Sequence, residues 1–175
     1  MHQKELDMRQ IIVFVLCAFF ASVSRANEDG GWQYAKWGMT PEQVITASNG
    51  VASPVQTQLV RARSYPDSTC ILREGINIQQ PTAVWNLDVS FCFSLSSGRL
   101  VRVTIDTPQR DEALCQLQYK QLLEMHGSPS IVTTPYSREW KWKNNVGTTA
   151  ITFVSVHAPN RFCKILYDEI PVASH

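Results

Sequence analysis

The feature that most constrains the fold of this chain is a pair of alternating segments joined by a short turn. Apolar residues at every second position occupy both segments: Leu87, Val89, Phe91 and Phe93 before the turn, and Val101, Val103 and Ile105 after it. A period of two places all of these side chains on one face of their strands. Ser96, Ser97 and Gly98 supply the turn. The pattern predicts an antiparallel hairpin with one apolar face that must be covered.

Two helices are predicted beside this hairpin. Thr40 is a suitable N-cap for a helix over 41–48, because Pro41 fits the first helical position and Gln43 completes a capping box. A longer helix is expected over 108–126, capped by Asp106 or Thr107 and ended by Gly127. Its expected buried stripe combines residues at helical spacing with their apolar neighbours: Cys115, Tyr119, Leu122 and His126, flanked by Leu114, Leu123 and Met125.

Further strands are expected over 140–143, 149–156 and 162–167, with shorter ones near 57–62 and 69–72. The order of elements predicts an α+β fold, in which an antiparallel sheet of about five to six strands carries two helices on one face. Residues 37–170 are expected to form this single domain, with a flexible segment at 27–36 and a tail at 171–175.

The first 26 residues are typical of a secretory signal peptide, which we expect to be removed. Arg9 precedes the apolar run 11–20, which is too short to span a bilayer, and Ser24-Arg25-Ala26 provides a cleavage site. Translation starts at Met1 or at Met8, since residues 1–7 are a poor leader. Leu16 before Cys17 does not fit a lipid-attachment signal. The pattern predicts export to a bacterial periplasm or the exterior, without a stable membrane anchor.

Four cysteines follow the leader, and an even number in an exported chain favours two disulfides. Cys115 on the core side of its helix is expected to pair with Cys163, and Cys70 with Cys92 on the other face of the sheet. No CxxC spacing is present, so we expect neither a metal site nor a cofactor.

Charge and motifs exclude several classes of function. After the leader the chain holds as many basic as acidic residues, so no global field favours nucleic acid. His126 and His157 lack the spacing of a metal or catalytic pair, and no nucleophile motif is present. The adjacent acids Asp168 and Glu169 point to opposite faces of a strand, so they do not form a catalytic dyad. The chain is therefore expected not to be an enzyme.

The segment Trp140-Lys141-Trp142-Lys143 has two interpretations. On a strand the tryptophans face the core and the lysines face solvent, which is the ordinary pattern of a half-buried strand. The alternative is a binding face composed of Lys141, Lys143, Arg102 and Lys164. The accessibility of the tryptophans distinguishes the two.

The segment Trp37-Gly38-Met39-Thr40-Pro41-Glu42-Gln43-Val44 resembles a helix-opening motif of small exported bacterial proteins. These include the β-lactamase inhibitory protein and the small lipoprotein of the outer-membrane β-barrel assembly machinery. The later segment Tyr119-Lys120-Gln121-Leu122-Leu123-Glu124-Met125-His126-Gly127-Ser128-Pro129, followed by Trp140, resembles the helix-turn-strand segment of related periplasmic proteins. The resemblance implies a helix-and-sheet scaffold that acts by binding.

Three functions are therefore weighed. The first is an exported, non-enzymatic module that binds another protein as an inhibitor, immunity factor or envelope accessory. The second is a periplasmic protein that binds a small ligand or a polyanion. The third, a hydrolase, requires His126 or His157 to meet a carboxylate and a nucleophile in a cleft.

Overall fold

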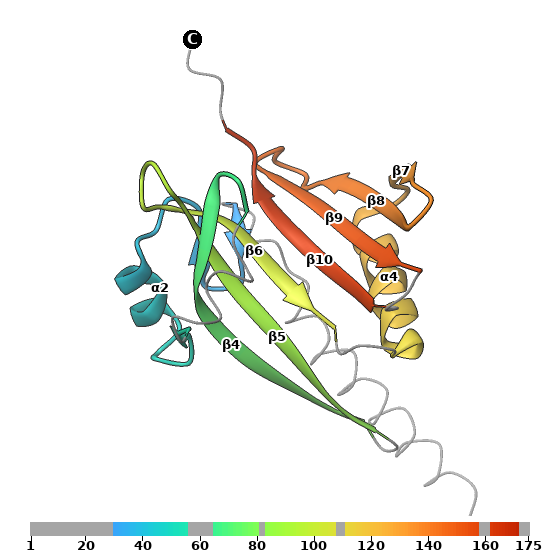
Figure 1. The fold of residues 1–175 in the computed structure, drawn as a ribbon, viewed down its shortest axis with the longest axis horizontal. Coiled ribbons are helices and arrows are strands. Elements are labelled where there is room, and N and C mark those ends of the chain that lie inside the picture. The colour runs from blue at the N-terminus through green and yellow to red at the C-terminus, as the bar shows by residue number, and fades with distance from the viewer. Residues whose placement is uncertain (1–29, 56–64, 81–82, 108–110, 158–161, 172–175) are drawn as a thin grey trace, which may run out of the picture.

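The computed structural model describes residues 30–55, 65–80, 83–107, 111–157 and 162–171 (Figure 1). The signal peptide over 1–26, the strand expected near 57–62 and the first residues of the second predicted helix lie outside these ranges. The elements are β1 (Gly31–Trp32), β2 (Ala35–Lys36), α2 (Pro41–Ala47), β3 (Ser53–Pro54), β4 (Ser68–Gln80), β5 (Ala83–Ser94), β6 (Leu100–Asp106), α4 (Glu112–His126), β7 (Ser130–Thr133), β8 (Ser137–Lys143), β9 (Thr149–Val156) and β10 (Phe162–Glu169).

The prediction of an α+β sandwich with about five to six strands is wrong. The described chain is mostly β, with an eight-stranded antiparallel sheet in the order β3-β4-β5-β6-β10-β9-β8-β7 and a separate β1-β2 pair. The main difference is β4, which pairs with β5 from Ser68 to Gln80. The short strand predicted near 69–72 is the first part of β4. Polar residues and Gly75 conceal the rest of it in the sequence, and a strand near the sheet edge tolerates them because its apolar face is incomplete.

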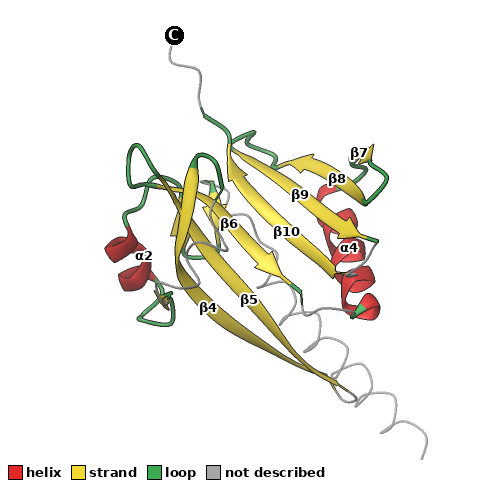
Figure 2. Cartoon of the chain, in the orientation of Figure 1, coloured by secondary structure: helices red, strands yellow, loops and turns green. Residues whose placement is uncertain are grey.

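The large sheet contains two similar halves. Each half is a helix followed later by a three-stranded meander, with α2 before β4-β5-β6 and α4 before β8-β9-β10. The meanders meet at their last strands, where β6 pairs with β10 antiparallel. In Figures 1 and 2, α2 lies toward the β4–β5 end and α4 lies behind β8, β9 and β10.

The register places the predicted apolar residues on one face, here called the core face, with the exception of Val101. A bulge in β6 puts Leu100 in the core in its place, so the prediction for Val101 is wrong. Phe91 opposes Val103, which opposes Tyr167, which opposes Ile151. All four are buried in a single hydrophobic cluster. The opposite face, here called the outer face, carries the alternate residues of the same strands. The predicted hairpin of β5 and β6 and the strands β8, β9 and β10 are therefore confirmed.

The helix α4 covers the β8–β10 half of the core face. It buries Leu114, Gln118 and Leu122, whereas Leu123 and Met125 are exposed, so the predicted stripe was too wide. The Tyr119 ring packs 5.0 Å from the Trp140 ring and 5.9 Å from that of Phe153, measured between centroids.

The predicted N-cap is confirmed for α2 but is wrong for α4. The capping box at Thr40 is present, with the Gln43 amide N–H donating to Thr40 Oγ1 at 3.3 Å and the Thr40 N–H to Gln43 Oε1 at 2.8 Å. The cap of α4 is Asp111, not Asp106 or Thr107, and Asp111 Oδ1 accepts from the Leu114 N–H at 2.9 Å.

Residues 30–36 differ from the flexible segment expected there. They form the β1–β2 pair, and Trp32 is fully buried against the sheet. Its ring lies 5.9 Å from that of Phe91, while the Tyr34 hydroxyl donates to Glu74 on β4. Burial of two aromatic rings offsets the entropy of ordering this short segment.

Two disulfides are present, in the pairing expected from the faces of the elements. Cys70 and Cys92 are register partners on β4 and β5. Cys115 joins α4 to Cys163 on β10 across the core face. Disulfides persist in oxidising compartments, so this covalent framework is compatible with an exported protein.

Candidate functional site

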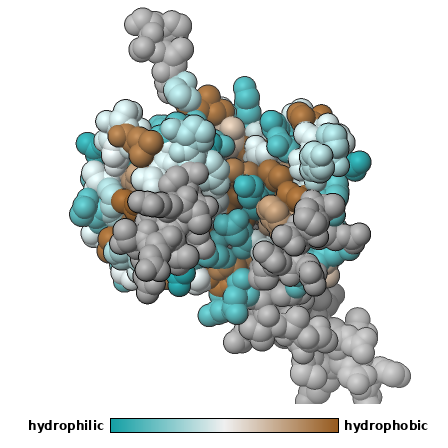
Figure 3. Space-filling model, in the orientation of Figure 1, coloured by the Kyte–Doolittle hydropathy of each residue, from teal (hydrophilic) through white to brown (hydrophobic). Residues whose placement is uncertain are grey.

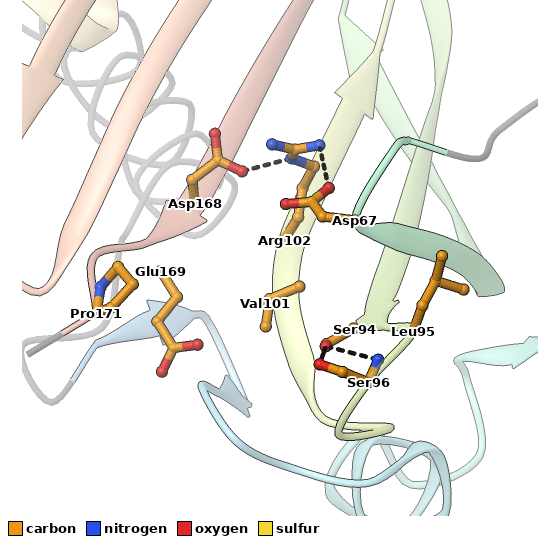
Figure 4. A pocket seen from close by; sticks show the side chains of 9 residues that line it. All are labelled: Asp67, Ser94, Leu95, Ser96, Val101, Arg102, Asp168, Glu169 and Pro171. Carbon is orange, nitrogen blue, oxygen red and sulfur yellow. Dashed lines mark hydrogen bonds and ion pairs between the residues drawn. The ribbon is translucent and has the colours of Figure 1, made fainter.

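A pocket of about 370 Å³ opens where several strand ends meet (Figure 4). Its lining comes from the segment before β4, the β5–β6 turn, the start of β6 and the end of β10. The lining residues are Asp67, Ser94, Leu95, Ser96, Val101, Arg102, Asp168, Glu169 and Pro171. Figure 4 shows Glu169 and Pro171 on one side, Ser94, Leu95 and Ser96 on the other, and Val101 between them.

A register irregularity shapes the floor of this pocket. Cys92 opposes Arg102 while Phe93 opposes Leu100, so Val101 is the extra residue of a β-bulge. A bulge leaves its extra residue unpaired and re-aims the side chains beside it. Here Leu100 remains in the core, whereas Val101 and Arg102 line the pocket.

The β5–β6 turn that forms one wall is held by its own side chains. Ser94 Oγ accepts from the backbone N–H groups of Ser96 at 3.2 Å and Ser97 at 3.3 Å. Gly98 closes the turn with φ of +64°, a conformation that favours glycine. This leaves the side chain of Leu95 65% exposed at the pocket wall.

Arg102 is engaged on three sides. Its Nε donates to Asp168 Oδ1, its Nη1 lies 3.9 Å from Asp67 Oδ1, and its guanidinium carbon lies 4.1 Å from the centroid of the Tyr65 ring. Asp168 and Arg102 are register partners on β10 and β6. A guanidinium that is already paired and stacked has little capacity left for an anionic ligand.

The remaining charge in the pocket is acidic. Asp67, Asp168 and Glu169 contribute three carboxylates against the single cation of Arg102. Burial raises the pKa of Glu169 above its ordinary value because desolvation disfavours the carboxylate. The arrangement can therefore receive a cationic group beside Glu169, with Leu95, Val101 and Pro171 as apolar walls.

All four basic residues predicted to form a binding face lie on the outer face, but the structure divides them. Lys164 Nζ lies 5.9 Å from the Tyr65 ring that Arg102 also covers, so these two residues come together. Lys141 and Lys143 are on β8, with β9 between them and β10. Where grey atoms do not cover it, the side of the molecule seen in Figure 3 carries both hydrophilic and hydrophobic residues.

On the outer face of β8, Lys141 also has a carboxylate beside it. Lys141 Nζ lies 3.0 Å from Glu139 Oε2 on the same strand. The two tryptophans of β8 point to the core face: Trp142 is 6% exposed, and Trp140 is partly buried and packs against the core cluster. The interpretation of 140–143 as a half-buried strand is therefore confirmed.

Several lining residues escaped the sequence reasoning. The sequence pattern excludes Asp168 and Glu169 as a catalytic dyad but does not indicate a pocket there, and it gives no signal for Asp67 or Leu95. The one signal for this site in the sequence is the pair of adjacent acids, Asp168 and Glu169, at the end of a predicted strand. Their meeting with Arg102 depends on the pairing of β6 with β10, which the sequence pattern does not specify.

The histidines do not join this pocket. His126 lies in the last turn of α4, and burial lowers its pKa because desolvation disfavours the imidazolium. Within the described ranges no group of three or more His, Cys, Asp or Glu side chains could hold a metal ion. No helix among the described elements has the length and apolar character needed to cross a bilayer.

Comparison with protein-family models, with curated proteins and with solved structures finds no match to this chain.

Proposed function

We propose that this chain is an exported module that binds another protein, and that the pocket at the end of the sheet receives a basic side chain of that partner. The observation that carries the proposal is the charge balance of the pocket. Its one cation is already paired with Asp168 and faces Asp67, while Glu169 lies on the opposite side. An incoming guanidinium or ammonium would supply the missing positive charge.

The shape of the pocket supports the same class of ligand. Arginine and lysine carry an apolar stem beneath a charged head. Leu95, Val101 and Pro171 can contact the stem while Glu169 meets the head. A protein partner fits better than a free small cation, because Leu95 is left exposed at the pocket wall and would be covered by surrounding chain.

A polyanion bound to the four basic residues of the outer face is the less favoured alternative. Arg102 and Lys141, two of the four basic residues that would bind it, already have carboxylate neighbours within 4.0 Å. To bind Arg102 or Lys141, a phosphate or sulfate group would have to displace Asp168 or Glu139, at the cost of leaving that carboxylate unpaired.

Export is the second part of the proposal. Two disulfides in the folded body and the leader pattern over 1–26 support it. Intact-mass analysis of protein made in a bacterial host from its own leader is expected to show a chain that begins at Asn27. Retention of residues 1–26, with free thiols at the four later cysteines, would contradict export.

Binding is tested with two short peptides, Ac-Ala-Arg-Ala-NH2 and Ac-Ala-Ala-Ala-NH2, followed by backbone NMR shifts. The arginine peptide is expected to shift the signals of Leu95, Val101 and Glu169, whereas the alanine peptide is not. Glu169→Gln is expected to weaken binding about fivefold, which corresponds to about 1 kcal/mol. Binding should also weaken as the pH falls, at a higher pH than for an exposed glutamate, because the pKa of Glu169 is raised.

The matched control is Glu124→Gln on α4, whose side chain is 64% exposed and lies outside the pocket. This variant is expected to bind the arginine peptide like the wild type. Equal loss in both variants would indicate nonspecific attraction of charge and would overturn the pocket assignment. Shifts on adding polyphosphate, with none on adding the arginine peptide, would favour the polyanion alternative.

A further inference from the structure

We infer that β7 is a self-association surface, which pairs antiparallel with β7 of a second copy of this chain about a two-fold axis through Val132. The inference does not depend on the pocket or on its ligand. It begins from the position of β7, which is the last strand of the eight-stranded sheet (Figure 1). Its one described neighbour in the sheet is β8.

Apart from its short length of four residues, the strand lacks the features that usually protect a sheet edge. Proteins blunt exposed edges with charged residues, proline or very short strands. The opposite edge of this sheet follows that rule, because β3 consists of Ser53 and Pro54 alone. By contrast, β7 has the sequence Ser-Ile-Val-Thr, with neither a charge nor a proline, and all four of its residues are exposed.

The side chains at this edge are also unusually apolar for exposed positions. Ile131 is 59% exposed and Val132 is 44% exposed. Leu123 and Met125, near the end of α4, are 38% and 39% exposed, and the chain joins them to β7 through residues 127–129. Two adjacent exposed β-branched residues on an edge strand, Ile131 and Val132, favour pairing with a further strand.

The hydrogen-bond pattern identifies the backbone groups that point outward. The Thr134 N–H donates to the Ser137 carbonyl at 2.8 Å, so these residues are a hydrogen-bonded pair at the start of the β7–β8 hairpin. In an antiparallel ladder such pairs alternate with non-bonded ones. Val132, opposite Glu139, therefore directs its N–H and C=O toward β8, and Ile131 and Thr133 direct theirs away from the sheet.

This outward set is self-complementary. With Val132 opposite Val132 of the second copy, Ile131 of the first copy opposes Thr133 of the second. By symmetry, Thr133 of the first copy opposes Ile131 of the second. The pairing forms four backbone hydrogen bonds and uses the outward N–H and C=O of both positions in each strand. The axis runs normal to the sheet, so each face continues as the same face. Val132 then occupies a non-bonded pair, where the Cα atoms approach to about 4.5 Å.

A second copy is favoured over an unrelated peptide by symmetry and charge. A two-fold interface brings the residue on its axis close to its own equivalent, so a charge at that position would repel its copy. The uncharged Ser-Ile-Val-Thr segment avoids this repulsion, and its β-branched residues suit cross-strand pairs. The association joins two eight-stranded sheets into one continuous sheet.

The test is sedimentation velocity of the full chain, produced with its own leader and purified, over a concentration range of about 5 to about 500 µM. The wild type is expected to move from monomer toward dimer across this range. Val132→Lys places two cations on the axis and is expected to raise the dimer dissociation constant at least about tenfold. Thr133→Pro removes an outward N–H but none of the hydrogen bonds to β8, and it should raise the dimer dissociation constant in the same way.

Val51→Lys is the matched control, because Val51 is 56% exposed and lies far from β7 in the sheet order, beside β3. It should dimerise like the wild type. Circular dichroism of each variant establishes that it is folded. A wild type that stays monomeric at the highest concentration would overturn the inference, as would dimers that survive both Val132→Lys and Thr133→Pro.

Cysteine cross-linking tests the register separately. Val132→Cys should form an intermolecular disulfide under mild oxidation, because a non-bonded antiparallel pair has the required Cα separation. Ser130→Cys should not, since the axis places Ser130 of the two copies about four residues apart along the strands. Efficient cross-linking of Ser130→Cys without Val132→Cys would contradict the proposed pairing.

Discussion

Arg102 on β6 and Asp168 on β10 are register partners, and their ion pair lies where the two meanders of the sheet meet. Both side chains are largely shielded, with 19% and 28% of their surface exposed. The β6–β10 pairing joins the halves of the sheet, so this contact contributes to their association as well as to the pocket.

Arg102→Met is expected to lower the free energy of unfolding by about 1–2 kcal/mol, because it leaves Asp168 without its charged partner and removes the contact with Tyr65. Urea denaturation measures the change. Lys120→Met is the control: its partner Glu124 is 3.9 Å away, and both side chains are more than half exposed. That variant should change stability by less than about 0.5 kcal/mol. Equal losses would show that the shielding of the Arg102 pair has no energetic consequence.

The two disulfides should differ in their contributions. The Cys115–Cys163 bond closes 48 residues, and the Cys70–Cys92 bond closes 22. The loss of chain entropy in the unfolded state predicts about 4 kcal/mol for the first and about 3 kcal/mol for the second. The double variants Cys115→Ser with Cys163→Ser and Cys70→Ser with Cys92→Ser, compared by urea denaturation, test this order. The reverse order would show that native-state geometry outweighs loop length.

The capping box of α2 provides a local test. Thr40→Ala removes the acceptor of the Gln43 N–H and is expected to cost about 1 kcal/mol. Thr40→Ser keeps a hydroxyl at the same place and should retain most of the stability. Thermal unfolding compares the two variants. A loss in Thr40→Ser as large as that in Thr40→Ala would mean that the side-chain methyl, and not the cap, is responsible.

Sequence reasoning succeeded where a pattern is local. The capping box at Thr40 depends on residues three apart, and the β5–β6 hairpin on a period of two with a turn between. It found only the first part of β4, the strand predicted near 69–72, because polar residues and Gly75 hide the rest of a strand that β5 pairs with along its length. The short strand β7 likewise depends on β8.

The pocket illustrates the same limit. Asp168 and Glu169 are adjacent in the sequence, yet their role depends on β10 pairing with β6, which brings Asp168 beside Arg102. The bulge at Val101, which turns that residue toward the pocket, arises from a shift of one position in the β5–β6 register. Hydrophobic periodicity specifies which face a residue occupies but not which strand lies next to it.

Buried tyrosines should make the fold sensitive to alkali. Tyr34 donates a hydrogen bond to Glu74, and Tyr167 is fully buried in the core. Desolvation raises the pKa of both phenols in the native state, and the Glu74 carboxylate raises that of Tyr34 further. In the unfolded chain both should titrate near the ordinary value of about 10. Above that pH the unfolded state holds fewer protons than the native state, so stability falls as the pH rises.

The contribution of these two tyrosines to the free energy of unfolding is therefore complete below about pH 10. Above that pH it declines by up to about 1.4 kcal/mol per pH unit for each tyrosine. Urea denaturation from about pH 8 to about pH 11 measures the slope. Tyr34→Phe should be less stable at neutral pH, because Glu74 loses its partner, and should show a shallower alkaline decline. Tyr136→Phe is the control, since Tyr136 is 71% exposed and should leave the slope unchanged. An unaltered slope in Tyr34→Phe would exclude this phenol as a source of the alkaline instability.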